Sequence, residues 1–270
     1  MSRLIIILSL LFNYFLAPAQ ELEIDSLLQL HFERAGGQLA WESLKSFIVE
    51  DSSLFIPAFK EPHERSLGDE SYWHVRVYCQ PFDKYRSERY EDSTLSSTTI
   101  ANSKEAEHRT YSTKTVISLP DDFRGRMLFQ ELSNLIGITP YILKARDEGE
   151  IEYKGVTEAY GQTCHTFLLK FSDPTSERDM NVYIDSTTYL VHAISHLKQM
   201  TSFLKKEDNY ALYSDYRSVD ELMIPHYQTS YLNDALQSER KILKVEVNQP
   251  LEDSLFEMKA VGKEWSIAGQ

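Results

Sequence analysis

The sequence has few glycines and prolines, and fewer basic than acidic side chains. It contains 10 Gly and 9 Pro in 270 residues, against 16 Tyr and 13 Phe. This composition excludes a low-complexity or disordered chain, and the aromatic content favours β-sheet. The formal net charge of −13 argues against nucleic acid as a ligand and against adsorption to anionic lipid head groups. An acyl chain in an internal apolar cavity is compatible with that charge, because surface charge matters little there.

Cysteine is also scarce, since Cys79 and Cys164 are the only two. Both fall within expected strands. They can form a single disulfide in an exported protein, or remain two buried thiols that pack as small apolar side chains. The sequence leaves both alternatives open. No Cys-x-x-Cys spacing is present, so these two residues do not indicate a metal site.

The motifs of common catalytic sites are missing. There is no G-x-S-x-G, no phosphate-binding glycine loop, no H-E-x-x-H and no dinucleotide fingerprint. His192 and His196 have the best spacing for a metal pair, but they lie in an expected strand, where four residues span roughly 13 Å. The carboxylates Asp185 and Asp220 lie in turn sequences, where Asp is a good turn residue. We therefore predict no enzymatic activity, no catalytic residue, no metal site and no cofactor.

Long apolar runs are confined to the first twenty residues. Arg3 precedes an apolar run that reaches Leu16, and Ala17-Pro18-Ala19 matches an A-x-A cleavage site. About 13 apolar residues are too few for a membrane span, which needs roughly 20. We predict a signal peptide over residues 1–19, cleaved near Ala19-Gln20. The mature chain is then exported and periplasmic, with no transmembrane segment.

The stretch from Asp121 to Gly149 predicts a helical hairpin between two β-rich halves. Apolar residues recur at helical spacing in its first helix, which Gly137 ends: Met127, Leu128, Leu132, Leu135 and Ile136. Thr139-Pro140 then supplies an N-cap and a proline at the first position of a second helix, which reaches about Asp147. The apolar stripe must lie against a sheet, because almost everything on either side alternates like β-strand.

A shorter helix is expected at the start of the mature chain. Asp25 can cap it, and Gly36-Gly37 can end it in the left-handed region. Leu28 and Phe32 then lie on its inward face, and a short second helical turn leads into the first strand.

Alternating polar and apolar residues predict about eleven or twelve antiparallel strands, joined by short polar turns. No linker rich in Gly, Pro or Ser divides the chain, so we expect one domain over residues 20–270, mainly β with some α, and a monomer. The expected strands are residues 47–55, 72–78, 84–90, 98–101, 109–117, 151–157, 163–171, 181–185, 189–197, 208–217, 222–231 and 240–247.

Four passages resemble the LolA/LolB-like superfamily, in its outer membrane lipoprotein-sorting branch. They are HFERAGGQLAWESLKSF, VYIDSTTYLVHAI, SDYRSVDELMIPHYQTS and VEVNQPLEDSLFEM, in that order along the chain. The resemblance implies a LolA-like, incompletely closed antiparallel β-barrel of about 11 strands, covered by the N-terminal helix and the central helical hairpin. Two features depart from the family. Glu221 stands where a glycine is usual after Val-Asp, and no cysteine follows the cleavage site, which excludes the lipid-anchored receptor half of the system.

The predicted function is that of a periplasmic carrier or sensor, which binds a lipid or a lipoprotein acyl chain in an apolar barrel cavity. A curved sheet of about eleven strands encloses more volume than its own side chains readily fill. The predicted roof of this cavity consists of Leu28, Phe32, Met127, Leu128, Leu132, Leu135 and Ile136. The alternative is a non-enzymatic envelope scaffold with a filled core, whose loops bind a protein partner and whose apolar stripe only packs.

Overall fold

The computed structural model describes residues 24–56, 71–121, 124, 128, 135–171, 179–196, 209–258, 260 and 265–268. The predicted signal peptide lies outside these residues, as do Met127 and Leu132 of the predicted roof. Among the described residues, no helix is both long enough and apolar enough to cross a membrane.

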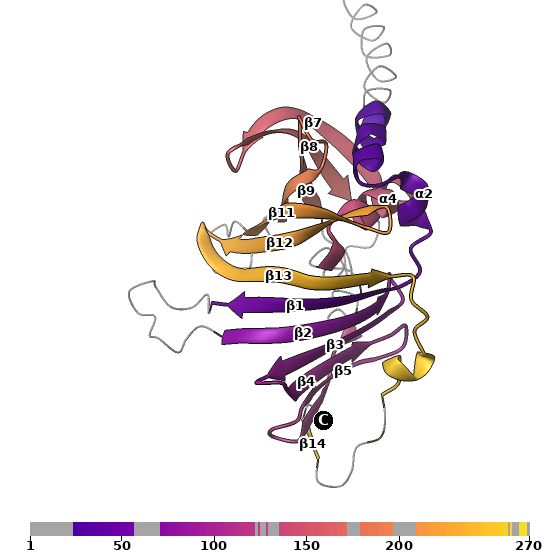
Figure 1. Ribbon diagram of the computed structural model, residues 1–270, viewed down its shortest axis with the longest axis vertical. Coiled ribbons are helices and arrows are strands. Elements are labelled where there is room, and N and C mark those ends of the chain that lie inside the picture. The colour runs from indigo at the N-terminus through magenta and orange to yellow at the C-terminus, as the bar shows by residue number, and fades with distance from the viewer. Residues whose placement is uncertain are drawn as a thin grey trace, which may run out of the picture.

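One open sheet organises the described part of the chain (Figure 1). Its strand order is β14-β6-β5-β4-β3-β2-β1-β13-β12-β11-β10-β9-β8-β7, and the terminal strands β14 and β7 do not pair with each other there. The strands are β1 (Phe47–Phe55), β2 (Ser71–Gln80), β3 (Lys84–Glu91), β4 (Thr94–Ala101), β5 (Ala106–Thr110), β6 (Thr115–Ser118), β7 (Glu150–Ala159), β8 (Gln162–Lys170), β9 (Met180–Asp185), β10 (Val191–His196), β11 (Asn209–Val219), β12 (Leu222–Leu232), β13 (Ala235–Val247) and β14 (Ser266–Ala268).

The prediction of a mainly β fold built on an antiparallel sheet that does not close is confirmed, but the strand count is higher than predicted. Thirteen strands pair antiparallel, and β14 adds a short parallel pairing to β6. The prediction of a single strand over residues 109–117 is wrong. A turn divides it into β5 and β6, because Lys114 has a positive φ of 50° and its N–H donates to the Tyr111 carbonyl at 3.3 Å.

The helices lie together at one end of the sheet, at the upper right of Figure 1. Residues 24–34 are helical, and α2 (Gln38–Glu42) and α4 (Thr139–Glu148) follow. The second helix of the predicted hairpin is therefore present as α4. Its N-cap is Ile138 without a side-chain hydrogen bond, so the capping role predicted for Thr139 is wrong. In the first helix of the hairpin, the described residues 121, 124, 128, 135 and 136 are helical.

The core lies between these helices and the inward face of the sheet. Successive side chains of a strand point to opposite faces, so alternate residues of β1 and β2 face inward. The inward residues Phe47, Val49 and Val77 are almost fully buried and belong to one cluster with Phe32 and Ile142 of the helices. The helices thus cover the apolar part of the sheet, as their own apolar stripes require.

A close backbone contact joins the N-terminal helix to the β11–β12 turn. Gly36 has a φ of 108°, and a Cβ placed there would lie 1.9 Å from the Glu221 carbonyl oxygen. Beside it, the Met223 N–H donates to the Ala35 carbonyl at 2.9 Å. Asp220 and Glu221 have φ values of 48° and 78°, the left-handed pair of a type I′ hairpin turn. The turn therefore keeps this conformation although Glu221 replaces the usual glycine.

This contact predicts different outcomes for two neighbouring glycines. Gly36→Ala should lower the free energy of unfolding by about 2–4 kcal/mol, from strain at positive φ and from the clash with Glu221. Gly37→Ala is the matched control, because its φ is 102° but no heavy atom lies within 4 Å of its added Cβ. The control should lose only about 1 kcal/mol. Urea unfolding measures both, and equal losses would show that the turn moves away without cost.

His31 connects the N-terminal helix to two other elements and is 1% exposed. Its Nδ1 donates to the Tyr189 carbonyl at 2.9 Å, and its Nε2 lies 3.3 Å from the Thr139 hydroxyl of α4. Burial lowers the pKa of His31 to about 4, although the hydrogen bond to Tyr189 opposes the shift. The folded protein therefore holds a neutral imidazole here, with Nδ1 protonated and Nε2 as an acceptor.

A neutral buried histidine makes stability depend on pH. Between about pH 6.5 and 4 the unfolded chain binds a proton at His31 that the folded chain excludes, so the free energy of unfolding falls as the pH falls. The contribution is complete above pH 6.5, and about 3 kcal/mol is lost by pH 4. Urea unfolding at several pH values should show a shallower fall for His31→Gln than for the wild type. Identical pH profiles for the two proteins would contradict this role of His31.

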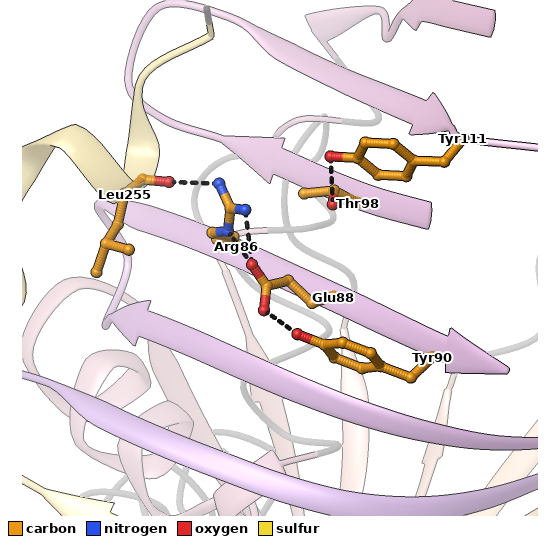
Figure 2. Close-up of polar contacts among 6 residues, drawn as sticks. All are labelled: Arg86, Glu88, Tyr90, Thr98, Tyr111 and Leu255. Atoms are coloured by element: carbon orange, nitrogen blue, oxygen red, sulfur yellow. Dashed lines mark hydrogen bonds and ion pairs between the residues drawn. The ribbon is translucent and has the colours of Figure 1, made fainter. Parts of the chain in front are cut away.

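A polar network holds the C-terminal segment against the outer face of β3 (Figure 2). Arg86 donates to Glu88 Oε1 at 2.6 and 2.9 Å and to the Leu255 carbonyl at 3.1 Å. The Tyr90 hydroxyl donates to Glu88 Oε2 at 2.7 Å. Burial, followed by this bond to Glu88, raises the pKa of Tyr90 to about 12. Leu255 belongs to a 3₁₀ helix, η2 (Asp253–Phe256), beyond which the chain reaches β14.

Candidate ligand-binding cavity

The inward face of the sheet changes from apolar to polar along its strands. In β1, the inward-facing residues Phe47 and Val49 are buried beside the helices. The next inward-facing residues along the strand are Asp51 and Ser53. Ser53 lies six residues beyond Phe47, about 20 Å further along the strand. There a cavity of about 390 Å³ opens on the inward face. Its size is within the range of small-molecule sites.

The cavity lining combines an apolar wall with a polar one. Strands β1 to β5 and β12 to β13 contribute the side chains. The apolar and aromatic members are Leu54, Phe55, Trp73, Val75 and Tyr85, and the polar members are Ser53, Ser87, Ser97, Thr99, Ser230, Ser238, Gln228, His108, Arg89 and Arg240. Among these described lining residues none is acidic. The cavity thus offers many hydrogen-bond donors next to an apolar surface.

Trp73 forms the centre of the apolar wall. The Phe55 ring, from β1, stacks with it at a centroid distance of 5.7 Å and an interplanar angle of 16°. From β3, on the other side of β2, the Arg89 guanidinium carbon lies 3.6 Å from the Trp73 ring centroid. A stacked guanidinium keeps its N–H donors in its own plane, at the perimeter of the contact. Trp73 therefore fixes the position of a positive charge at the cavity wall.

A second guanidinium is held by the pairing of β1 with β13. The register of these strands shifts between Glu50 and Asp51, which is a bulge at the level of the cavity. Arg240 Nε lies 3.4 Å from Asp51 Oδ2 and 3.4 Å from the Ser53 hydroxyl, which itself donates to Asp51 Oδ1 at 2.6 Å. Asp51 is fully buried, and within the described residues Oδ2 receives no hydrogen bond. The carboxylate is thus paired to Arg240 by charge alone.

His108 lies on the β5 side of the cavity. Its Nδ1 is 2.9 Å from the Thr99 hydroxyl, and its Nε2 is 3.4 Å from the Thr110 hydroxyl. Burial, together with the positive charge of Arg89, lowers the pKa of His108. The neutral imidazole is therefore favoured, so Arg89 and Arg240 are the charged side chains among the described lining residues.

The predicted roof residues that the structure describes come together in the core. Leu28, Phe32, Leu128, Leu135 and Ile136 are all at most 9% exposed and belong to one hydrophobic cluster. None of them lines the 390 Å³ cavity. Tyr85 belongs both to the cavity lining and to this cluster. Their role as the roof of a ligand site stays a prediction, and the cavity lining is a set of residues that the sequence analysis missed.

A weak signal for this lining exists in the sequence. Ser53 and Phe55 are an even number of residues from Phe47 and Val49. If residues 47–55 form a strand, the side chains of all four therefore point to the same face. Polar residues on an inward face are unusual and indicate a site. The signal becomes clear only when several strands are aligned, and the strand register is what the sequence does not supply.

The two cysteines take no part in the cavity. Cys79 and Cys164 are both buried, and no disulfide joins them. Burial, with smaller contributions from the charges of Asp185 and Glu158, raises the pKa of Cys164 to about 11, so it is not a nucleophile at neutral pH. No group of three or more side chains that could hold a metal ion occurs among the described residues.

Comparison with solved structures shows which fold this is. A putative outer membrane lipoprotein-sorting protein domain from Vibrio parahaemolyticus matches with a TM-score of 0.56 at 12% identity, over 85% of this chain and 95% of that one. A LolA superfamily protein from Nitrosomonas europaea matches with a TM-score of 0.56 at 10% identity, over 84% and 96%. A DUF1329 family protein from Desulfovibrio piger matches with a TM-score of 0.57 at 9% identity, over 86% and 96%.

These likenesses establish the fold at low sequence identity. No protein-family model matches the sequence, and no match is found among curated proteins. The resemblance stated from the four sequence passages is thus confirmed in the fold: the chain folds like LolA superfamily and lipoprotein-sorting domains.

Proposed function

We propose that this chain, which has the fold of lipoprotein-sorting domains, is an exported, periplasmic carrier or sensor for a lipid or a lipoprotein acyl chain. The observation that supports this most is the position of the cavity. Tyr85 lines the cavity and also belongs to the core cluster beneath the helices, and Val75 lines it and packs against that cluster. The cavity therefore adjoins the core beneath the helices, and we take it as the entrance by which an acyl chain reaches the space between the sheet and the helices.

An acyl chain that follows this path gains affinity from apolar burial. Each buried methylene contributes on the order of 0.8 kcal/mol, so six buried methylenes give about 5 kcal/mol before the entropic cost of binding. No catalytic group is needed for this function. The chain enters only if the helices move away from the sheet, because Phe32, Leu135 and Ile136 are almost fully buried in the described state.

The same burial favours a second candidate function. A core this tightly packed suits an envelope scaffold whose loops bind a protein partner and whose interior binds nothing. The two functions differ in whether the purified protein takes up an acyl chain. Native mass spectrometry of protein isolated gently from its own periplasm separates them: a stoichiometric acyl-bearing adduct supports the carrier, and a bare mass after incubation with phospholipids supports the scaffold.

Filling the cavity mouth should block entry. We expect Val75→Trp to weaken the binding of 1-monolauroylglycerol by about tenfold or more, equivalent to displacing roughly two methylenes from the wall. His74→Trp is the matched control, since it adds an indole to the adjacent residue of β2 on the exposed, opposite face. Isothermal titration calorimetry measures both affinities, after circular dichroism has shown that both variants fold. Unchanged affinity in Val75→Trp would rule out the cavity as the entrance.

The predicted roof has its own test, which needs no destabilising variant. A lauroyl probe with a diazirine at the chain end should label the helices on irradiation, at Phe32, Leu135 or Ile136, because these residues lie beyond the cavity in the core. Peptide mass spectrometry locates the label. If the label is found on the cavity strands or the outer surface alone, the acyl chain does not reach the helices and the roof assignment is wrong.

A further inference from the structure

We propose that serine side chains of the cavity recognise an uncharged head group that carries several hydroxyls, a glycerol or a sugar, on the bound amphiphile. The acyl chain of the same molecule then extends past Tyr85, which belongs to both the lining and the core cluster. This inference rests on the proposed function, and it adds the chemical class of the head group, which neither the sequence nor the fold specifies.

Four serine hydroxyls of the lining are available to a ligand. In the described part of the chain, no residue forms a hydrogen bond with the side-chain hydroxyl of Ser87, Ser97, Ser230 or Ser238, and all four line the cavity. Ser97 is only 8% exposed. A buried hydroxyl without a hydrogen bond is destabilising, so such groups normally bind water or a ligand. The four serines therefore need a partner from inside the cavity.

Other polar side chains of the lining already have partners within the protein. The Ser53 hydroxyl donates to Asp51 Oδ1 at 2.6 Å, and Arg240 Nε lies 3.4 Å from the other oxygen of this carboxylate. The Thr99 hydroxyl lies 2.9 Å from His108 Nδ1. The four serines differ from these residues in having only the cavity to bond to, and their hydroxyls require no charge on the ligand.

The register of the sheet gathers these hydroxyls into two groups. Ser230 lies directly opposite Ser238 in the β12–β13 pairing. Ser87 lies opposite Thr99 in the β3–β4 pairing, and Ser97 is the next residue of β4 on the same face. Residues directly opposite each other have Cβ atoms about 4.5–5.5 Å apart. Strands β1 and β2 lie between the two groups and supply most of the apolar lining, so a ligand there meets hydroxyls on both sides of an apolar surface.

A polyol matches this surface in both of its properties. A serine hydroxyl donates one hydrogen bond and also accepts, so it is fully used only by a partner that does both. Glycerol and sugars carry hydroxyls on adjacent carbons, and their C–H groups can face the apolar lining. A phosphate or carboxylate accepts hydrogen bonds but donates none when it is ionised, so it uses only the donor side of the serines. The lining therefore favours several neighbouring hydroxyls on the ligand.

Two probes that differ in their hydroxyls test the proposal. 1-Monolauroylglycerol has two hydroxyls, and 2,3-dimethoxypropyl laurate has the same skeleton with both of them methylated. With the wild-type chain, below the probes' micellar concentrations, calorimetry should give about tenfold or more tighter binding for monolauroylglycerol, the value of roughly two neutral hydrogen bonds. Glycerol alone should bind at least about a hundredfold more weakly than its lauroyl ester, because it buries no acyl methylenes.

A third probe distinguishes the two sources of hydroxyls. 6-O-Lauroylglucose has the same acyl chain on a sugar. Tighter binding than that of monolauroylglycerol assigns the head group to a sugar, and weaker binding assigns it to a glycerol.

Serine variants assign the preference to the cavity. Ser230→Ala/Ser238→Ala and Ser87→Ala/Ser97→Ala should each lower the preference for monolauroylglycerol by about threefold or more, and should leave the dimethyl ether unchanged. Neither pair should lower the urea midpoint of unfolding, because no described hydrogen bond is lost. Ser218→Ala is the control, since it removes an exposed hydroxyl of β11 outside the lining. It should leave both affinities unchanged.

Each outcome separates this inference from the proposed function. If no lauroyl probe binds, the carrier function fails and the inference fails with it. If monolauroylglycerol and its dimethyl ether bind equally, or if the preference survives in both serine pairs, the carrier function stands and the hydroxyl-bearing head group is wrong. The head group is also wrong if 1-lauroylglycerol 3-phosphate binds about tenfold or more tightly than monolauroylglycerol in the wild type and in both serine pairs. If glycerol alone binds as tightly as its lauroyl ester, the site serves a small free polyol, which overturns the lipid ligand.

Discussion

The pairing of β1 with β13 is the constraint on which the rest of the sheet depends. It joins residues about 200 positions apart, Phe47 to Val247, and it is the seam between β1–β6 and β7–β13 in the strand order. Without it the sheet separates into two meanders, each with an uncovered apolar face. The bulge in this seam sets the Asp51–Arg240 contact. Bulges often occur beside functional sites, where they redirect side chains, and here one long-range pairing fixes both the architecture and this contact beside the cavity.

The inward face of the sheet has an apolar part and a polar part. Near the helices it is apolar, and packing determines every position. Farther along the same strands it carries hydroxyls and two guanidiniums, and no described helix covers it. An amphiphile has this same division between chain and head group. The match between the two ends of the face and the two ends of a lipid supports a carrier over a filled scaffold, although the helices are closed in the described state.

Local patterns in the sequence predicted most strands, α4 and the inward residues Leu28 and Phe32. They did so because each pattern depends on local conformation alone. Polar and apolar residues alternate in a strand, apolar residues recur at helical spacing in a helix, and Gly36-Gly37 marks a helix end. Three features escaped them. The turn before Lys114 contains no glycine to reveal its positive φ, and β14 is three residues long, too short for any pattern. The cavity depends on register between distant strands. Arg89 and Arg240 are 151 positions apart, and only the pairing through β1 brings their walls together.

An open sheet has two edges, and this chain treats them differently. At one edge β7 carries charged side chains and a register shift at Gly155, both of which discourage another strand from adding to it. At the other edge β6 is paired with β14, the last described segment of the chain. The edge strand on this side is therefore β14, which is only three residues long. A strand this short presents few free backbone groups, so it offers another strand much less to pair with than an uncovered β6 would.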